Sequence, residues 1–349
     1  MQIDILTTQE AAVLQELIAA SSHIVITCHK SPDGDAIGSS LAWAEYLHSL
    51  GKESVVLVPD AYPDFLQWLP NTQTIVRYDK HPENGDMLLK TADLVFCLDY
   101  NESSRVEMMQ AALDGVTARK VVIDHHLLPS TTTADDGAGE RLLISRPELS
   151  STCELVFRIV WQLGGFELMP KSWAVQVYCG MMTDTGGFTF NSTRPEIFFI
   201  IGQLLTKRID KDKIYRKVYN NYSSWAIRLR GYVMCNKLNV FEDLHAAYFS
   251  ISKKEMHDFH FIKGDAEGLV NEPLRIKNMR LSISLREDDR VPNLVWVSLR
   301  SVDNFPCNKM AEQYFNGGGH LNASGGRLNC SLQEAEQITR KAIMEFKDN

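Results

Sequence analysis

The stretch Val121–His126, which reads Val-Val-Ile-Asp-His-His, constrains the fold of this chain more than any other. Three β-branched apolar residues run directly into a carboxylate and two imidazoles. This pattern is typical of a strand that is buried on both faces of a parallel sheet and delivers polar side chains at its carboxyl end. A histidine at a strand end is more often packed or solvated than a ligand, so this stretch alone predicts a strand and not yet a site.

Other apolar runs end in the same way. Residues 23–28 form a predicted strand that ends at His29, and residues 94–98 form another that ends at Asp99. Helical patterns separate the strands, most clearly over 36–50. Apolar strands that alternate with helices predict a doubly wound α/β domain with a mostly parallel sheet over about the first half of the chain.

The second half of the chain has a different pattern. Helical segments dominate its beginning, and strands mixed with helices follow, for example over 246–251 and 294–299. A chain of 349 residues is long enough for two domains, each with its own core. We predict an α/β domain over 1–194, a helical connector over 195–238 and a smaller α+β domain over 239–349.

The net charge of −8 is distributed unevenly. Residues 228–349 contain 17 Lys and Arg against 16 Asp and Glu, whereas residues 1–227 have a net charge of −9. The acidic balance argues against a protein that coats long nucleic acid. The acidic part suits a carboxylate cluster that holds cations, and an anionic substrate is more easily bound by the nearly neutral part.

The cysteines and the hydropathy of the chain indicate in which cellular compartment the protein is expected. The seven cysteines are an odd number without a Cys-x-x-Cys pair, and Cys28, Cys97 and Cys179 lie in apolar runs typical of reduced, buried thiols. The longest apolar run, over 197–205, is interrupted by Gly202 and is too short to cross a bilayer. The N-terminus carries no secretory signal pattern. We therefore expect a cytoplasmic protein that does not contact membranes.

Acidic and imidazole side chains gather at the ends of these predicted elements. They are His29, Asp33, Asp35, Asp99, Asp124, His125, His126 and Asp184. Carboxylates with a minority of imidazoles and no thiolate favour Mn²⁺ or Mg²⁺ over a structural zinc. Six or more ligands exceed the need of one such ion, so two ions that share Asp99 as a bridge fit better. Each acid by itself has an alternative interpretation as a solvated strand end or a helix cap.

Two metals about 3.5–4 Å apart activate water and bind a phosphoryl group during in-line attack, so this pattern predicts a phosphoryl hydrolase. A second candidate site follows later in the chain, where Gly317, Gly318 and Gly319 precede His320. Consecutive glycines let backbone N–H groups turn around an anion. Arg300, just upstream, offers a planar fork for phosphate. A plain loop and a surface arginine are the alternatives.

Taken together, these motifs resemble those of the DHH phosphoesterases. The elements His29-x-x-x-Asp33-x-Asp35, Asp99, Asp124-His125-His126 and Asp184 look like the four motifs of that family. The sequence Gly-Gly-Gly-His over 317–320, with Asn322–Gly325, looks like the signature of the DHHA1 domain that accompanies them. The resemblance covers nearly the whole chain in the expected order. One departure is Ala323-Ser324-Gly325, where the family often has Ala-Ala-Gly.

The resemblance implies a Mn²⁺-dependent hydrolase, with Mg²⁺ as the alternative ion and the active site in a cleft between two domains. One metal would be held by His29, Asp33 and Asp99, and the other by Asp35, Asp99, His125 and Asp184. His126 would contact the scissile phosphate with support from Asp124, which makes these two the catalytic residues. A phosphate of the substrate remote from the metals would be bound by Arg300, Gly317, Gly318, Gly319 and His320.

Within the family, the compact two-domain form is most similar to the nano-RNases that also dephosphorylate pAp (3′-phosphoadenosine 5′-phosphate). We therefore expect an enzyme that hydrolyses RNAs of about two to five nucleotides to mononucleotides and removes the 3′-phosphate of pAp. One alternative is a sister phosphoesterase that acts on cyclic dinucleotides, pyrophosphate or polyphosphate. Another is a non-enzymatic nucleotide- or RNA-binding module. The expected partner is a short single-stranded RNA or a nucleotide, not long duplex nucleic acid, and a homodimer is compatible with this function.

Overall fold

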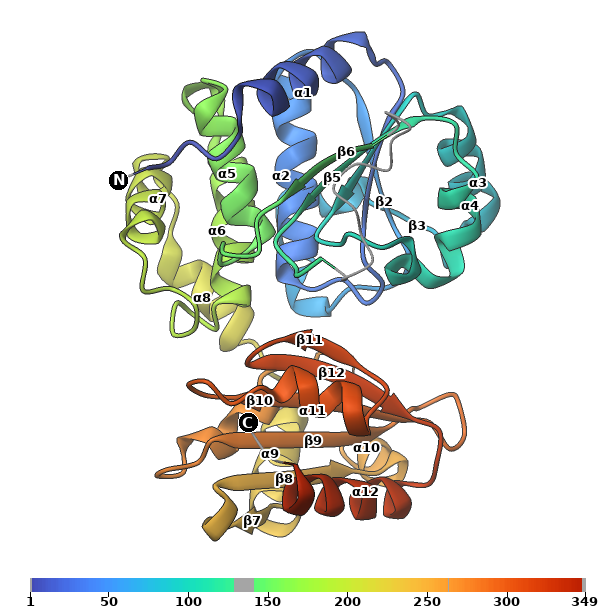
Figure 1. Ribbon diagram of the computed structural model, residues 1–349, viewed down its shortest axis with the longest axis vertical. Coiled ribbons are helices and arrows are strands. Elements are labelled where there is room, and N and C mark those ends of the chain that lie inside the picture. The colour runs from blue at the N-terminus through green and yellow to red at the C-terminus, as the bar shows by residue number, and fades with distance from the viewer. Residues whose placement is uncertain (1, 129–140, 263, 347–349) are drawn as a thin grey trace. The chain divides into compact units, whose positions relative to one another are not determined.

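The computed structural model describes residues 2–128, 141–262 and 264–346 of the chain (Figure 1). Backbone contacts divide the chain into two compact units, Met1–Asn221 and Tyr222–Asn349. Each unit has its own sheet and its own apolar core. Within the described residues, no helix combines the length and the apolar character that crossing a membrane requires.

The first unit is built on a parallel sheet of six strands. In spatial order these are β3 (Val76–Arg77), β2 (Ser54–Val58), β1 (Ile24–Cys28), β4 (Leu94–Leu98), β5 (Arg119–Asp124) and β6 (Arg141–Ser145). All neighbouring pairs are parallel. The predicted doubly wound sheet is therefore confirmed. Strand order reverses between β1 and β4, and ligands of open α/β sheets bind beyond the carboxyl ends of the strands at such a reversal.

Helices cover both faces of this sheet (Figure 1). The helices of this unit are α1 (Thr8–Ala20), α2 (Gly34–Ser49), α3 (Pro82–Thr91), α4 (Gln110–Asp114), α5 (Thr152–Gln162), α6 (Lys171–Asp184), α7 (Pro195–Thr206) and α8 (Lys211–Tyr219). Of these, α7 packs against α5 and α6, and α8 packs against α6. Because successive side chains of a strand point to opposite faces, Ile26 of β1 joins the core with α2, α5 and α6, whereas Val25 joins the smaller core with α3 and α4. Short 3₁₀ turns connect several elements, among them η3 (Ser103–Met109).

Glycines let helices α2, α5 and α6 approach closely. A Cβ atom on Gly38 of α2 would lie 2.7 Å from the carbonyl oxygen of Gln176. A Cβ atom on Gly180 of α6 would lie 2.2 Å from Sγ of Cys153 and 2.9 Å from Oδ1 of Asp35. Any larger residue at these positions would push the helices apart. This close packing places the start of α2 beside the start of α5 and the end of α6.

The second unit contains a mixed sheet of six strands. In spatial order these are β11 (Gly318–His320), β12 (Ala323–Leu328), β10 (Val295–Ser301), β9 (Leu281–Glu287), β8 (Ala246–Ile251) and β7 (Asn239–Phe241). Strands β8 and β9 are parallel, and the other neighbouring pairs are antiparallel. Its helices are α9 (Ser224–Asn236), α10 (Lys253–Asp258), α11 (Cys307–Tyr314) and α12 (Leu332–Glu345). The smaller α+β part of the prediction is thus confirmed.

The stretch predicted as a connector, 195–238, is helical and consists of α7, α8 and α9. Helices α7 and α8 fall in the first unit, and α9 begins the second. The division into domains over 1–194 and 239–349 with a separate connector stays a prediction.

Candidate metal centre

The predicted metal ligands of the first unit converge beyond the carboxyl ends of the central strands. His29 follows β1, Asp99 follows β4, and His125 and His126 follow Asp124, the last residue of β5. Asp33 caps α2 by accepting hydrogen bonds from the backbone N–H groups of residues 35 and 36, and Asp35 lies in the first turn of that helix. Asp184 is the last residue of α6 and so comes from a helix end.

One group consists of His29, Asp33 and Asp99, whose candidate ligand atoms lie within 4.8 Å of one another. Nε2 of His29 lies 3.3 Å from Oδ2 of Asp99 and 4.0 Å from Oδ1 of Asp33. Adjacent ligand atoms of an octahedral ion with bonds of about 2.1 Å are about 3 Å apart, so these spacings are close to those of an ion site. Nδ1 of His29 donates to the carbonyl oxygen of Lys30 at 2.8 Å, which leaves Nε2 free to bind a metal.

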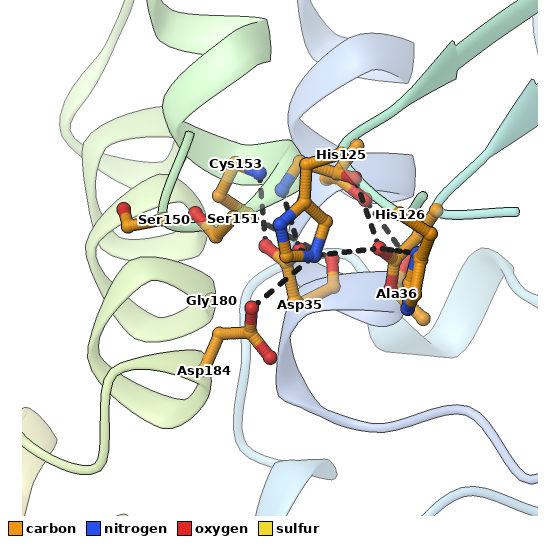
Figure 2. A network of polar contacts seen from close by, with 12 residues as sticks. Asp35, Ala36, His125, His126, Ser150, Ser151, Cys153, Gly180 and Asp184 are labelled. Atoms are coloured by element: carbon orange, nitrogen blue, oxygen red, sulfur yellow. Dashed lines mark hydrogen bonds and ion pairs between the residues drawn. The ribbon is translucent and has the colours of Figure 1, made fainter. Parts of the chain in front are cut away.

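The other group consists of Asp35, His125 and Asp184. Nε2 of His125 lies 3.3 Å from Oδ2 of Asp184 and 3.9 Å from Oδ2 of Asp35, and Figure 2 shows the imidazole directed at both carboxylates. Nδ1 of His125 donates to the carbonyl oxygen of Leu149 at 3.3 Å. The ring is therefore oriented in the same way as that of a metal ligand whose second nitrogen is held by the backbone.

Asp99 touches both groups. Its Oδ2 faces His29, and its Oδ1 lies 3.6 Å from Nε2 of His125. The residue is 1% exposed and has a left-handed backbone with φ of 65°, and its N–H donates to the carbonyl oxygen of Ile123 at 3.1 Å. One carboxylate between two ligand groups is the arrangement that a bridging ligand of two ions needs.

The charges of the site fit divalent cations. Burial and then the charges of neighbouring aspartates, Asp35 first, raise the pKa of Asp99 well above its usual range. Burial and the charge of Asp184 raise the pKa of Asp35 to about 7. Burial lowers the pKa of both His29 and His125, so these imidazoles are neutral and can act as ligands. Crowded carboxylates with neutral imidazoles and no thiolate favour Mn²⁺ or Mg²⁺.

The predicted catalytic pair lies beside the ligand groups. Nδ1 of His126 donates to Oδ1 of Asp124 at 2.7 Å, and Nδ2 of Asn101 donates to Oδ2 of the same carboxylate at 2.7 Å. Burial lowers the pKa of His126, but the hydrogen bond and charge of Asp124 outweigh it, so the pKa is raised. Nδ1 of His126 also lies 3.7 Å from Oδ1 of Asp99. The imidazole is therefore fixed next to the Asp99 carboxylate.

Sequence reasoning missed a set of groups that hold the ligands. The backbone N–H groups of Thr152 and Cys153 donate to the two oxygens of Asp35 at 2.6 and 2.8 Å. The hydroxyl of Thr152 donates to Oδ1 of Asp99 at 2.9 Å. Sequence reasoning also missed Asn101, whose side chain donates a hydrogen bond to Asp124. The Ser-Ser-Thr-Cys-Glu run over 150–154 was the available signal, because it predicts a helix start, where N–H groups can bind a carboxylate.

The predicted phosphate-binding residues belong to the second unit. Gly318–His320 forms strand β11, paired antiparallel with β12, so these three residues do not form the plain loop that was the alternative interpretation. A Cβ atom on Gly317 would lie 1.9 Å from the carbonyl oxygen of Gly325, and Gly319 has φ of 140°. Close strand approach therefore accounts for these two glycines. Arg300 is half-buried in β10 and donates to the carbonyl oxygen of Leu299 at 2.9 Å.

Comparison with known proteins agrees with this geometry. A family model described as "DHH family, N-terminal domain" matches residues 23–181. The chain is 28% identical to the bifunctional oligoribonuclease and PAP phosphatase NrnA of Thermus thermophilus, over 95% of this chain and 93% of that protein. It is 26% identical to the cyclic-di-AMP phosphodiesterase GdpP of Geobacillus thermodenitrificans over 95% of its own length, but it spans about half of that protein.

A solved structure extends the comparison to the whole chain. The exopolyphosphatase-related protein of Bacteroides fragilis is 46% identical, with a TM-score of 0.89 over 97% of this chain and 98% of that chain. Similarity at this level over both units, together with the match to the family model over residues 23–181, which carry every candidate ligand except Asp184, shows that the chain belongs to the DHH family of phosphoesterases.

Proposed function

We propose that the protein hydrolyses RNAs of a few nucleotides to mononucleotides and removes the 3′-phosphate of pAp. The observation that carries the phosphoesterase part is the pair of neighbouring ligand groups, with Asp99 of the first group also beside His125 of the second. The substrate part is supported by similarity to an oligoribonuclease and PAP phosphatase along almost the full length of both chains. The location in the cytoplasm and the homodimer stay predictions.

The proposed ligands of one ion are His29, Asp33 and Asp99, and those of the other are Asp35, Asp99, His125 and Asp184. Two Mn²⁺ or Mg²⁺ ions bound there supply an activated water and neutralise charge on the phosphoryl group. Within the chain, Asp124 keeps His126 oriented and raises its pKa. In the proposed reaction His126 donates a hydrogen bond from Nε2 to a phosphoryl oxygen, where negative charge develops.

The second unit is proposed to bind a phosphate of the substrate that does not react. Arg300 supplies a guanidinium with several N–H donors, Gly318 and Gly319 supply backbone N–H groups, and His320 supplies an imidazole. Gly317 belongs to the same proposed segment, but its own N–H donates to the carbonyl oxygen of Ala311 at 3.2 Å. Loss of this binding would weaken substrate affinity rather than the chemical step. The nearly equal numbers of acidic and basic residues in this half of the chain are compatible with an anionic substrate.

A specific observation favours a second candidate function. The relative with 46% identity is described as exopolyphosphatase-related, so polyphosphate is the main alternative substrate. The similarity to a cyclic-di-AMP phosphodiesterase adds cyclic dinucleotides. All of these substrates contain a phosphoryl group that the same type of metal site can bind. They differ in the chemical groups that surround this phosphoryl group.

A substrate panel tests the proposal. Purified protein with Mn²⁺ is incubated with di- to pentaribonucleotides, pAp, cyclic di-AMP, pyrophosphate and polyphosphate, and products are separated by chromatography. We expect mononucleotides from the short RNAs and AMP from pAp. In the same assay His126→Gln should lower kcat with little change in Mn²⁺ binding, and Arg300→Ala should mainly raise KM. Release of phosphate from polyphosphate alone, with short RNA and pAp intact, would replace our proposal with the alternative.

A further inference from the structure

The segment Leu149–Cys153, between β6 and the first turn of α5, contacts three of the proposed metal ligands. Its first residue accepts a hydrogen bond from His125. Its last residue, Cys153, donates to Asp35 (Figure 2). Thr152 makes two such contacts, from its N–H to Oδ2 of Asp35 at 2.6 Å and from its hydroxyl to Oδ1 of Asp99 at 2.9 Å. Thr152 therefore contacts a ligand of one ion and the carboxylate shared by both.

The segment is itself held by a buried ionic network. Glu154, which is fully buried, accepts hydrogen bonds from the N–H and hydroxyl of Ser150 at 2.8 and 2.7 Å. The same carboxylate is paired with Arg158 at 2.7 Å and with Arg194 at 2.9 Å. Because this anion is compensated by two guanidiniums and several hydrogen bonds, its geometry is well defined. This network thus holds Thr152 in a fixed position beside the proposed metal ligands.

We propose that Thr152 is a positioning residue that couples the two proposed metal sites. Its hydroxyl restrains the Oδ1 atom of Asp99, while its N–H restrains the carboxylate of Asp35. Both carboxylates are then held in the ligand geometry before an ion arrives, so less ordering is needed when ions bind. Removal of the hydroxyl frees the shared carboxylate and weakens binding of both ions together.

This inference rests on the proposed two-metal site but not on the proposed substrate. The hydroxyl is the group to test, because the N–H to Asp35 remains whatever side chain stands at 152. Thr152→Val keeps the volume and removes the hydroxyl, whereas Thr152→Ser keeps the hydroxyl. Thr339→Val is a matched control, since Thr339 is also fully buried in a helix but its hydroxyl donates to the carbonyl oxygen of Ala335, in the second unit.

The experiment is a titration of the metal-free protein with Mn²⁺ in the absence of substrate. Calorimetry and electron paramagnetic resonance monitor the binding. We expect two ions per chain in the wild type. Mn²⁺ affinity should fall about 10- to 100-fold in Thr152→Val, the range for lost outer contacts of metal ligands. Thr152→Ser should bind within about threefold of the wild type, and Thr339→Val should be unchanged. Thr152→Ala replaces the valine variant if circular dichroism shows that the latter does not fold.

Three results would overturn the inference. Wild-type affinity in the variants without the hydroxyl would show that it does not position the ligands. Equal weakening in Thr152→Ser and Thr152→Val would show that packing, not the hydroxyl, matters. A wild-type protein that binds no Mn²⁺ would contradict the metal site itself and with it this inference. A wild-type protein that binds two ions but leaves short RNA intact would contradict only the proposed substrate.

Discussion

At the scale of single residues, Asp99 is the candidate ligand whose position and conformation are most constrained. It is buried, its backbone has a positive φ, and its two oxygens face two ligand groups. Asn is the informative replacement, because Asn tolerates a left-handed backbone and its carbonyl oxygen can still accept from Thr152. The change removes only the negative charge and one ligand oxygen.

We expect Asp99→Asn to lower activity by more than about 100-fold, since loss of a shared ligand should exceed the cost of losing an outer contact. The metal-free variant should unfold at a higher temperature than the metal-free wild type, because it no longer buries a carboxylate among other carboxylates. Activity assays and thermal unfolding test both effects. Asp93→Asn, at an exposed Asp beside His23, is the control. Wild-type activity in Asp99→Asn would contradict the bridging role.

At the scale of elements, the distances between helices decide where the ligands stand. Gly180 of α6 faces Cys153 of α5 and Asp35 of α2. An added methyl group must displace one of them, and overpacking of this kind costs about 1–3 kcal/mol. We therefore expect Gly180→Ala to destabilise the protein by roughly that amount and to weaken Mn²⁺ binding, because Asp35 is moved. Denaturant unfolding and Mn²⁺ titration measure the two effects.

Gly202 of α7 provides the matched control. It is exposed in the middle of a helix, and a Cβ atom there would meet nothing within 4 Å. Gly202→Ala should stabilise the protein by about 0.5–1 kcal/mol through helix propensity and leave Mn²⁺ binding unchanged. If Gly180→Ala behaved like Gly202→Ala, the proposed closeness of α2, α5 and α6 would be wrong.

At the scale of the whole molecule, the carboxylate cluster makes stability depend on pH. The pKa of Asp35 is about 7 in the folded protein, compared with 3.8 for an ordinary Asp. The folded state therefore holds this proton more tightly than the unfolded state. The contribution of Asp35 to stability is fully present below about pH 4 and is lost as the pH rises through about 7. The lowered pKa values of His29 and His125 act in the opposite direction.

Comparison with Asp35→Asn isolates the effect of Asp35. Without metal, the unfolding temperature of the wild type should fall relative to that of this variant as the pH rises from about 4 to about 7. Added Mn²⁺ should stabilise the wild type more at the higher pH, because ions compete with protons for the carboxylates. Scanning calorimetry over this pH range measures both trends. A difference between the two proteins that does not change with pH would contradict the raised pKa of Asp35.

The sequence by itself determined the central strands β1, β4 and β5 of the first sheet and the order in which the candidate ligands follow them. Apolar runs such as 94–98 and 120–123 are local patterns, and parallel strands bring their carboxyl ends to one edge whatever the loops do. This is why His29, Asp99 and His125 could be expected to meet. Strand β6 and the sheet order could not be read from such local patterns.

Only the tertiary structure decided which groups support the ligands. Thr152 donates to Asp35, 117 residues away in the chain, and no local pattern encodes such a contact. The same holds for Gly317, whose lack of a side chain is explained by the carbonyl oxygen of Gly325 on the neighbouring strand. Residue types and their spacing are sufficient to predict chemistry at strand ends, whereas the orientation of each ligand depends on packing between distant segments.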